Sequence, residues 1–259
     1  MIVAAAIAPH GTPAFEPSPT RDALEEIGRR FEAAVPEATV VVTPHNVHVE
    51  GHFAVVDAAT VAGDLAQWGE PERVLERQVD RDLVGALTAA ADGLPLLTVS
   101  YGGNDAATAA APLDWGTLIP LAFLPETPVV VVSPARDRPL AEHVELGRAI
   151  ASASAGKRVA LIASADHGHA HDPDGPYGFD PASAEYDEAI VDLVQTNRLD
   201  RLGELEPLVA AAKADSLWQM VVLHGALHNQ LGDSYDVELL SYEAPTYFGM
   251  LCAAYAPSA

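Results

Sequence analysis

The sequence contains a single cysteine, Cys252, among its 259 residues. One cysteine excludes an internal disulfide and any cysteine-rich zinc or iron–sulfur site, so we expect Cys252 to be a buried core thiol. Basic residues are also scarce, because 14 Lys and Arg stand against 37 Asp and Glu, which gives a formal net charge of −23. This charge repels nucleic acid and anionic membranes, and we expect neither as a partner.

Long hydrophobic runs and nucleotide-binding motifs are missing as well. The first apolar run, residues 2–8, lacks a basic start and is too short to span a membrane, which favours a first strand over a signal peptide and predicts a cytoplasmic protein. No glycine-rich segment has the spacing of a nucleotide fingerprint. The few basic residues lie away from the motifs described below, so the sequence offers no arginine clamp for a substrate carboxylate.

Continuous apolar runs bounded by proline and glycine predict strands that are covered on both faces. They occupy residues 2–8, 38–43, 95–100, 128–133 and 158–164, with a later candidate at 237–242. Helical periodicity marks residues 20–35, 139–153, 182–195 and 214–227, with Thr20 as N-cap of the first helix. This alternation predicts an α/β fold, one domain over residues 1–259, with a mostly parallel central sheet flanked by helices on both faces.

Two of the apolar runs end in Pro-His, at His10 and at His45. Two such strands lying side by side would aim both imidazoles into one crevice. Two imidazoles and one carboxylate on one face of an iron(II) ion leave positions free for a chelating substrate and dioxygen. Asp215, at a helix start, and Glu243, after the last strand candidate, are the candidate acids. Without a metal, Asp215 is an ordinary helix cap and Glu243 an ion-pair partner.

Three histidines, His167, His169 and His171, follow the apolar run 158–164. The long turn-rich segment that carries them is expected to form a wall or lid of the site. The three histidines are too close in sequence for all of them to point the same way. Only one of them is therefore expected to be catalytic. A histidine that faces a metal without binding it can take a proton from a bound phenol. The alternative is a histidine-rich loop that binds adventitious metal or none.

The order APHG, TPH, SADHGHAHDPDGPYGFDPASAEYD, LHGAL and LLSYEAP resembles the class III extradiol ring-cleavage dioxygenases, the catalytic B-subunit superfamily. Its members include protocatechuate 4,5-dioxygenase, the aminophenol and DOPA dioxygenases and the Memo-like proteins. The resemblance implies that His10 and His45 bind the metal and that His169 is the acid/base. It implies Asp215 as the third ligand, where the family usually has glutamate, with Glu243 as the reserve ligand.

The resemblance also bears on the substrate and on the metal. Trp115 stands where many members have histidine, and Tyr177 lies in the family's Gly-Pro-Tyr-Gly element, so both are implied to contact substrate. The implied reaction is extradiol cleavage of a small catechol- or aminophenol-type aromatic by a non-haem Fe(II) ion, with O2 as co-substrate and zinc or manganese as alternative metals. We expect a homo-oligomer, and some relatives add a small accessory subunit. The alternatives are a Memo-like metal-binding or interaction protein and a zinc-dependent hydrolase.

Overall fold

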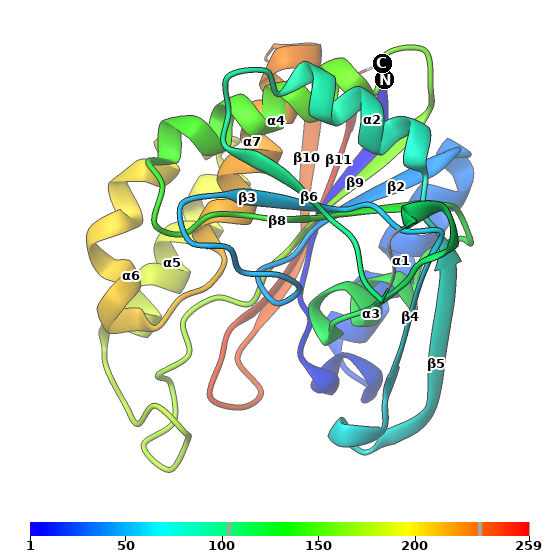
Figure 1. Cartoon of the computed structure of the whole chain (residues 1–259). Helices are drawn as coiled ribbons and strands as arrows, with labels where there is room; N and C mark the ends of the chain where they lie inside the picture. Colours follow the sequence, from blue (N-terminus) through cyan, green and yellow to red (C-terminus); the bar gives the residue numbers. More distant parts are fainter. Residues whose placement is uncertain (103–104, 233–234, 259) are drawn as a thin grey trace.

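The computed structural model describes residues 1–102, 105–232 and 235–258, which are built around an eight-stranded sheet (Figure 1). From one edge to the other, the strands are β10 (Tyr235–Glu243), β11 (Met250–Pro257), β1 (Ile2–Ala8), β9 (Val159–Ser164), β2 (Ala38–Val42), β8 (Val129–Ser133), β3 (Phe53–Val56) and β6 (Leu96–Val99). The four central strands β1, β9, β2 and β8 run parallel to one another. Nearly all of their residues are buried, because both faces of this central part are covered.

Antiparallel pairs complete the sheet on either side of this parallel centre. β11 pairs antiparallel with β1 and with β10, and β3 pairs antiparallel with β8 but parallel with β6. The fold is therefore a single α/β domain with a mostly parallel central sheet, as the sequence predicts.

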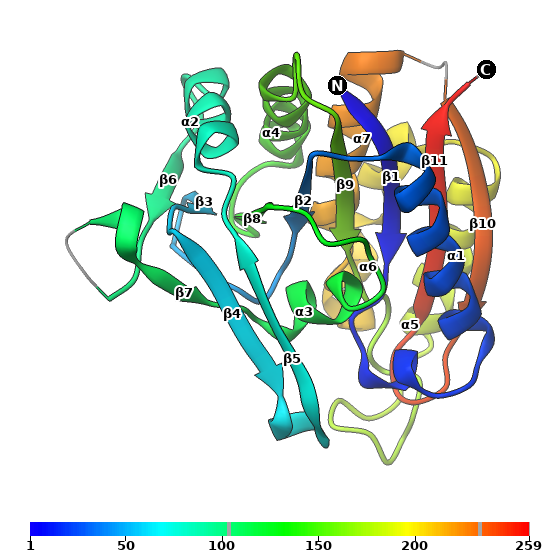
Figure 2. The same ribbon diagram turned by 90° about the vertical axis from the view of Figure 1, so that its right-hand side faces the viewer.

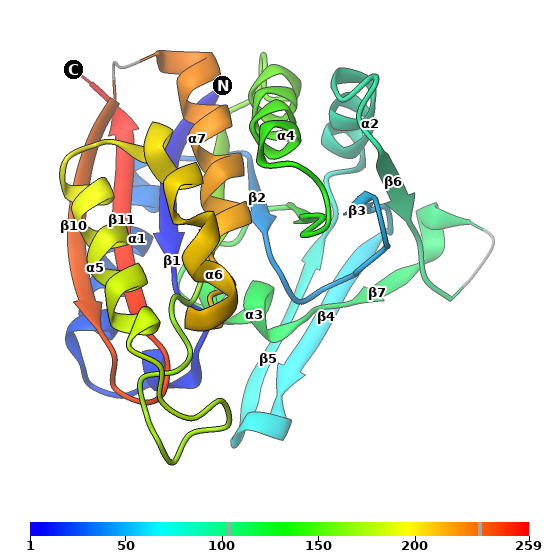
Figure 3. The same ribbon diagram turned by 90° about the vertical axis from the view of Figure 1, so that its left-hand side faces the viewer.

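Helices lie on both faces of the sheet. They are α1 (Pro19–Ala34), α2 (Arg81–Ala90), α3 (Trp115–Leu121), α4 (Leu140–Ala153), α5 (Ala182–Gln195), α6 (Glu206–Ala212) and α7 (Leu217–Leu231), with short 3-10 turns η1 (Thr12–Phe15), η2 (Ala66–Trp68), η3 (Ala106–Thr108) and η4 (Leu199–Leu205). Figure 2 shows the face that α1 covers, and Figure 3 shows the opposite face with α4, α5, α6 and α7. None of the helices in the described ranges has the length and apolar content that a membrane crossing needs.

A second sheet, which the apolar runs did not predict, covers part of the same face as α1. Its strands are β5 (Glu70–Gln78), β4 (Thr60–Leu65) and β7 (Ala110–Pro112), in that order. β5 reads EPERVLERQ, and most of its side chains are exposed or half-buried, so it has no continuous apolar run. The β4–β5 turn carries Trp68, and β7 leads into α3, which begins at Trp115.

Three predicted details differ in the structure. β9 lies between β1 and β2, so the two strands that precede His10 and His45 are not side by side. The run 95–100 forms an edge strand, β6, whose residues are exposed or half-buried rather than covered on both faces. The N-cap of α1 is Ser18, whose side chain accepts a hydrogen bond from the Arg21 N–H, rather than Thr20.

Helices α4 and α7 pack closely through glycines. A Cβ atom on Gly147 would lie 2.1 Å from the carbonyl oxygen of Val222, and one on Gly225 would lie 2.2 Å from the carbonyl oxygen of Val144. Backbone atoms cannot yield as a flexible side chain can. The Gly-Ala-Leu segment of α7 is therefore fixed by helix packing, which in turn sets where α7 begins beside the sheet.

Gly225→Ala is expected to lower the free energy of unfolding by about 2–3 kcal/mol, because the added methyl group would force the two helices apart. Gly85→Ala in α2 is the matched control, since a Cβ atom there meets nothing within 4 Å. The control is expected to stabilise the protein by about 0.5–1 kcal/mol, because alanine favours a helix. Urea unfolding measures the free energy of unfolding of both variants. Equal effects of the two substitutions would contradict the close packing of α4 against α7.

Candidate metal centre

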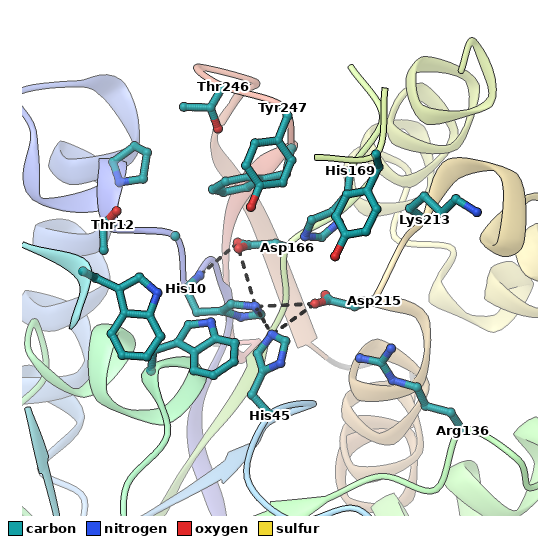
Figure 4. Close-up of a pocket in the computed structure, with 16 residues that line it drawn as sticks. His10, Thr12, His45, Arg136, Asp166, His169, Lys213, Asp215, Thr246 and Tyr247 are labelled. Carbon is teal, nitrogen blue, oxygen red and sulfur yellow. Dashed lines mark hydrogen bonds and ion pairs between the residues drawn. The ribbon is translucent and has the colours of Figure 1, made fainter. Parts of the chain in front are cut away.

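The candidate ligands meet at the carboxyl ends of the parallel strands (Figure 4). His10 follows β1 and His45 follows β2, and each leaves its strand through a proline. Although β9 runs between the two strands, the loops bring the imidazoles together over its end. The Nε2 atoms of His10 and His45 lie 3.0 Å apart, and their rings meet edge to face.

Asp215, from the residues just before α7, completes this group. Its Oδ2 atom lies 3.6 Å from Nε2 of His10 and 3.3 Å from Nε2 of His45. Its Oδ1 atom is buried and has no hydrogen-bond partner within the described ranges. Atoms bound 2.0–2.1 Å from one ion lie about 3.0 Å apart at right angles and about 3.4 Å apart at tetrahedral angles. The spacing and the orphaned oxygen therefore fit a divalent cation held by His10, His45 and Asp215.

The electrostatics of this group favour a bound cation. Burial opposes the charged form of His10, but the carboxylates of Asp166 and Asp215 outweigh it and raise the pKa of His10 to about 9. Burial likewise opposes the ionised form of Asp215, yet hydrogen bonds with His10 and His45 hold its pKa below the usual range. A site that attracts a proton this strongly also attracts a metal ion, which would displace that proton.

The other side of His10 is fixed by hydrogen bonds. Its Nδ1 atom lies 3.0 Å from Oγ of Ser164, and that hydroxyl donates to the carbonyl oxygen of Gly116. Because the hydroxyl hydrogen is already used, Oγ accepts from Nδ1–H, and this leaves the lone pair of neutral His10 on Nε2, the atom that faces His45 and Asp215. The backbone N–H of His10 also donates to Oδ1 of Asp166, at 2.9 Å.

His169 faces the same pocket but does not belong to the ligand group. Its Nδ1 atom lies 2.6 Å from the carbonyl oxygen of His167, so Nδ1 carries the hydrogen and Nε2 is the free acceptor. Phe248 stacks on the ring at a centroid distance of 5.5 Å, and Tyr177 meets it edge-on at 6.1 Å. His169 is thus a pocket histidine held by its neighbours, with Nε2 as the acceptor atom.

The two neighbouring histidines have other partners. His167 is fully buried, its Nδ1 atom lies 3.0 Å from Oγ of Ser216, and burial lowers its pKa. His171 pairs through Nε2 with Oδ2 of Asp187, at 2.8 Å. The three histidines thus point in three directions, and of the three, His169 is the one that lines the pocket.

Glu243 lies apart from the ligand group. Its Oε1 atom accepts a hydrogen bond of 3.0 Å from the backbone N–H of Thr20, in the first turn of α1. A carboxylate is favourable there, because the helix N-terminus carries partial positive charge. Glu243 therefore has a structural role that accounts for it without a metal, and Asp215 is the acid that the geometry favours as third ligand.

The pocket has a volume of about 390 Å³, and the two residues expected to contact substrate, Trp115 and Tyr177, both line it. Trp115 stacks on His45 with a centroid distance of 4.2 Å. Sequence reasoning missed other lining residues, which are Gly11, Thr12, Pro13, Trp68, Arg136, Asp166, Lys213, Thr246, Tyr247 and Phe248. Of these, Asp166 had a usable signal, since it follows the buried strand β9 as closely as His10 follows β1. Its Oδ2 atom lies 3.5 Å from Nε2 of His10.

Asp187, on α5, anchors the loop that carries His169. Its buried carboxylate accepts hydrogen bonds from the Gly168 N–H at 2.7 Å, from Nε2 of His171 at 2.8 Å and from the Tyr242 hydroxyl at 2.7 Å. The loop is therefore tied to both the helix and the sheet on either side of His169.

Asp187→Ala is expected to lower the free energy of unfolding by about 3 kcal/mol, because it leaves the buried Gly168 N–H and the part-buried donors of His171 and Tyr242 without their shared acceptor. Asp192→Ala, on the exposed side of the same helix, is the control and is expected to change it by less than about 0.5 kcal/mol. Guanidinium unfolding followed by circular dichroism compares the two. An Asp187 variant as stable as the control would show that the carboxylate does not hold the loop.

Residues 5–250 match the family described as the catalytic LigB subunit of aromatic ring-opening dioxygenase. The match covers most of the chain, and the protein belongs to this family. Dioxygenases of this family are generally metal-dependent, which agrees with the His-His-Asp group at the sheet edge.

The chain is also similar to two other proteins, one in sequence and one in structure. It is 23% identical over 233 residues to Protein CA_C1420 of Clostridium acetobutylicum, an alignment that covers 86% of this chain and 49% of that protein. The chain thus spans about half the length of this curated relative. The crystal structure of uncharacterized protein JW3007 from Escherichia coli K12 superimposes with a TM-score of 0.66 at 17% identity, over 97% of this chain and 99% of that one. This second likeness establishes a common fold.

Proposed function

We propose that the protein is a non-haem iron(II)-dependent extradiol dioxygenase that opens a catechol- or aminophenol-type ring. The observation that carries this proposal is the placement of His169, with a free Nε2 atom, in the same pocket as His10, His45 and Asp215. Membership of the ring-opening dioxygenase family supports it.

The proposed metal site consists of His10, His45 and Asp215. An iron(II) ion bound there would supply chelation of the two adjacent ring substituents and a path for electrons from the ring to dioxygen. Two imidazoles and one carboxylate are the donor set that suits this ion. The carbonyl oxygen of His167 and the hydroxyl of Ser164 hold the imidazoles of His169 and His10 in the required orientations.

His169 is the proposed acid/base. Its Nε2 atom takes the proton of a substrate hydroxyl, and the resulting imidazolium is stabilised because Nδ1–H already donates to the His167 carbonyl oxygen. The same Nε2–H can return the proton later in the reaction. The stacked ring of Phe248 keeps the imidazole in place during both transfers.

Aromatic side chains form the proposed walls for the substrate ring. Trp115 and Trp68 lie on the side of His45, with ring centroids 5.1 Å apart, and Tyr177 and Tyr247 lie on the side of His169. Flat apolar walls orient a flat substrate and exclude water from the reacting atoms. The indole of Trp115 makes this pocket less polar than one with histidine at that position.

The test is oxygen uptake by protein purified without air and loaded with iron(II). A panel of catechols and 2-aminophenol is expected to consume oxygen and to give yellow ring-opened products, whereas zinc-loaded protein is expected to give neither. Stoichiometric iron without oxygen uptake from any member of the panel would contradict the proposal. That result would favour a Memo-like binding role, and ester or amide cleavage by the zinc form would favour a hydrolase.

A cytoplasmic location and self-association are part of the same proposal. Cys252 is a free, buried thiol, which suits a reducing compartment. Tyr177 and Phe179 are exposed by 56% and 63% beside the pocket, an aromatic surface of the kind that a second copy would cover. Sedimentation across a range of protein concentrations tests the association, and a monomer at every concentration would contradict it.

A further inference from the structure

Nearly all the basic side chains of this acidic protein have partners. Of the 14 Lys and Arg, ten form ion pairs with carboxylates, and Arg77 and Arg158 donate to backbone carbonyl oxygens. The two that remain are Arg136 and Lys213, which have neither a carboxylate nor a hydrogen-bond acceptor in the parts of the chain that the structure describes. Both line the candidate metal pocket.

Arg136 lies between β8 and α4, and its guanidinium is directed into the pocket, as Figure 4 shows. Its Cζ atom lies 5.0 Å from the centre of the Trp218 ring, on α7. An aromatic ring holds a guanidinium by its flat face, which leaves the N–H groups at the edge free to donate. Lys213 follows α6 and also lines the pocket, but its ammonium group points away from the ligand group in Figure 4, so Arg136 is the cation directed inward.

The acids of the pocket do not neutralise these two cations. Asp215 and Asp166 lie against the imidazoles of His10 and His45, and no ion pair joins either acid to Arg136 or Lys213 within the described residues. In a chain of net charge −23, the two unpaired cations are gathered at one cavity. Both side chains are exposed at the mouth of the pocket, so water solvates them in the free protein, and an anionic ligand that enters the pocket could replace that water.

We infer that Arg136 forms a subsite for a carboxylate carried by the aromatic substrate. A guanidinium matches a carboxylate with two parallel hydrogen bonds, which fixes the orientation of the ring as well as adding affinity. The subsite rests on the proposed function, because it places the carboxylate at Arg136 and the two adjacent ring substituents at the metal group. The substrate class is therefore an acidic catechol or aminophenol rather than a neutral one.

Calorimetric binding under anaerobic conditions tests this subsite without turnover. The probes are 3,4-dihydroxybenzoate, 3,4-dihydroxyphenylacetate and 3,4-dihydroxyphenylpropionate, each compared with its uncharged amide, on iron(II)-loaded protein. We expect at least one acid to bind about 10- to 100-fold more tightly than its amide. Arg136→Gln is expected to remove that preference and to leave amide binding unchanged. Arg138→Gln is the matched control, because Arg138 lies on the same loop but is paired with Glu142, and it is expected to keep the preference.

The possible results of this experiment test the anion subsite and the proposed dioxygenase function separately. Equal binding of every acid and its amide would overturn the anion subsite while leaving ring cleavage intact, and a preference that survives Arg136→Gln would overturn its assignment to Arg136. Failure of all six compounds to bind, in protein that holds iron, would instead count against the proposed function. Oxygen uptake with the same acid and amide pairs then gives KM for each compound. KM is expected to be lower for the acids, because Arg136 is proposed to bind the substrate.

Discussion

Asp215→Ala is expected to abolish stoichiometric metal binding and to weaken the affinity for iron(II) by at least about 100-fold. The loss follows from the geometry, because removal of the carboxylate leaves two imidazoles whose Nε2 atoms lie 3.0 Å apart and takes away the acid that lies within 3.6 Å of both. Metal content after dialysis, together with titration of the metal-free protein, gives the result. Asp215→Asn, which keeps the shape of the side chain, shows whether the loss comes from charge or from misfolding.

Glu243→Gln is the control for the Asp215 variants. Glu243 accepts a hydrogen bond from the Thr20 N–H at the start of α1, so its replacement is expected to leave the metal content unchanged and to cost about 1 kcal/mol of stability. Loss of metal in the Glu243 variant, with normal metal in the Asp215 variants, would reverse the ligand assignment.

His169→Ala is expected to lower kcat by about 10²- to 10⁴-fold while the protein retains its iron. In the proposed mechanism His169 supplies a proton acceptor and no ligand, so its removal is expected to affect the chemical step and not the metal. Oxygen-uptake kinetics and metal analysis of the same sample separate the two effects. His52→Gln is the matched control, because the His52 ring pairs with the Glu50 carbonyl oxygen outside the pocket, and it is expected to have normal activity. Loss of iron from the His169 variant would mean that His169 is a ligand.

The sequence predicted the parts of the site that directly follow buried strands. His10 and His45 were recognisable because a continuous apolar run and a proline precede each of them, and such runs belong to the parallel centre of an α/β sheet. The helix after Asp215 was visible through its periodicity. What this pattern did not reveal was the strand order, because β9 enters between β1 and β2 from far along the chain.

The parts that the sequence did not predict depend on long-range packing. β4 and β5 are exposed on one side and carry charged residues, so they lack the continuous apolar runs of the central strands, and Trp68 therefore had no visible link to the site. Arg136 was equally hidden, because nothing near it in sequence distinguishes it from Arg138. The difference between them is that Arg138 pairs with a carboxylate four residues away, whereas the partner of Arg136 among the described residues is an aromatic ring from another helix.

Trp68 contacts Trp115, and Trp115 stacks on His45. These two contacts connect the small sheet that contains β4 and β5 with the central sheet, and substitutions have different effects in the two sheets. Two of the three candidate metal ligands, His10 and His45, follow strands of the central sheet, where a shift of either strand would disturb their spacing. The wall beside these ligands includes Trp68 in the turn of the β4–β5 hairpin, whose outer residues tolerate change. Substitutions in that hairpin can therefore reshape the space for the substrate ring while the reaction machinery stays fixed. Substitutions in the β4–β5 hairpin can therefore change which substrate is accepted, without changing the residues proposed to carry out the reaction.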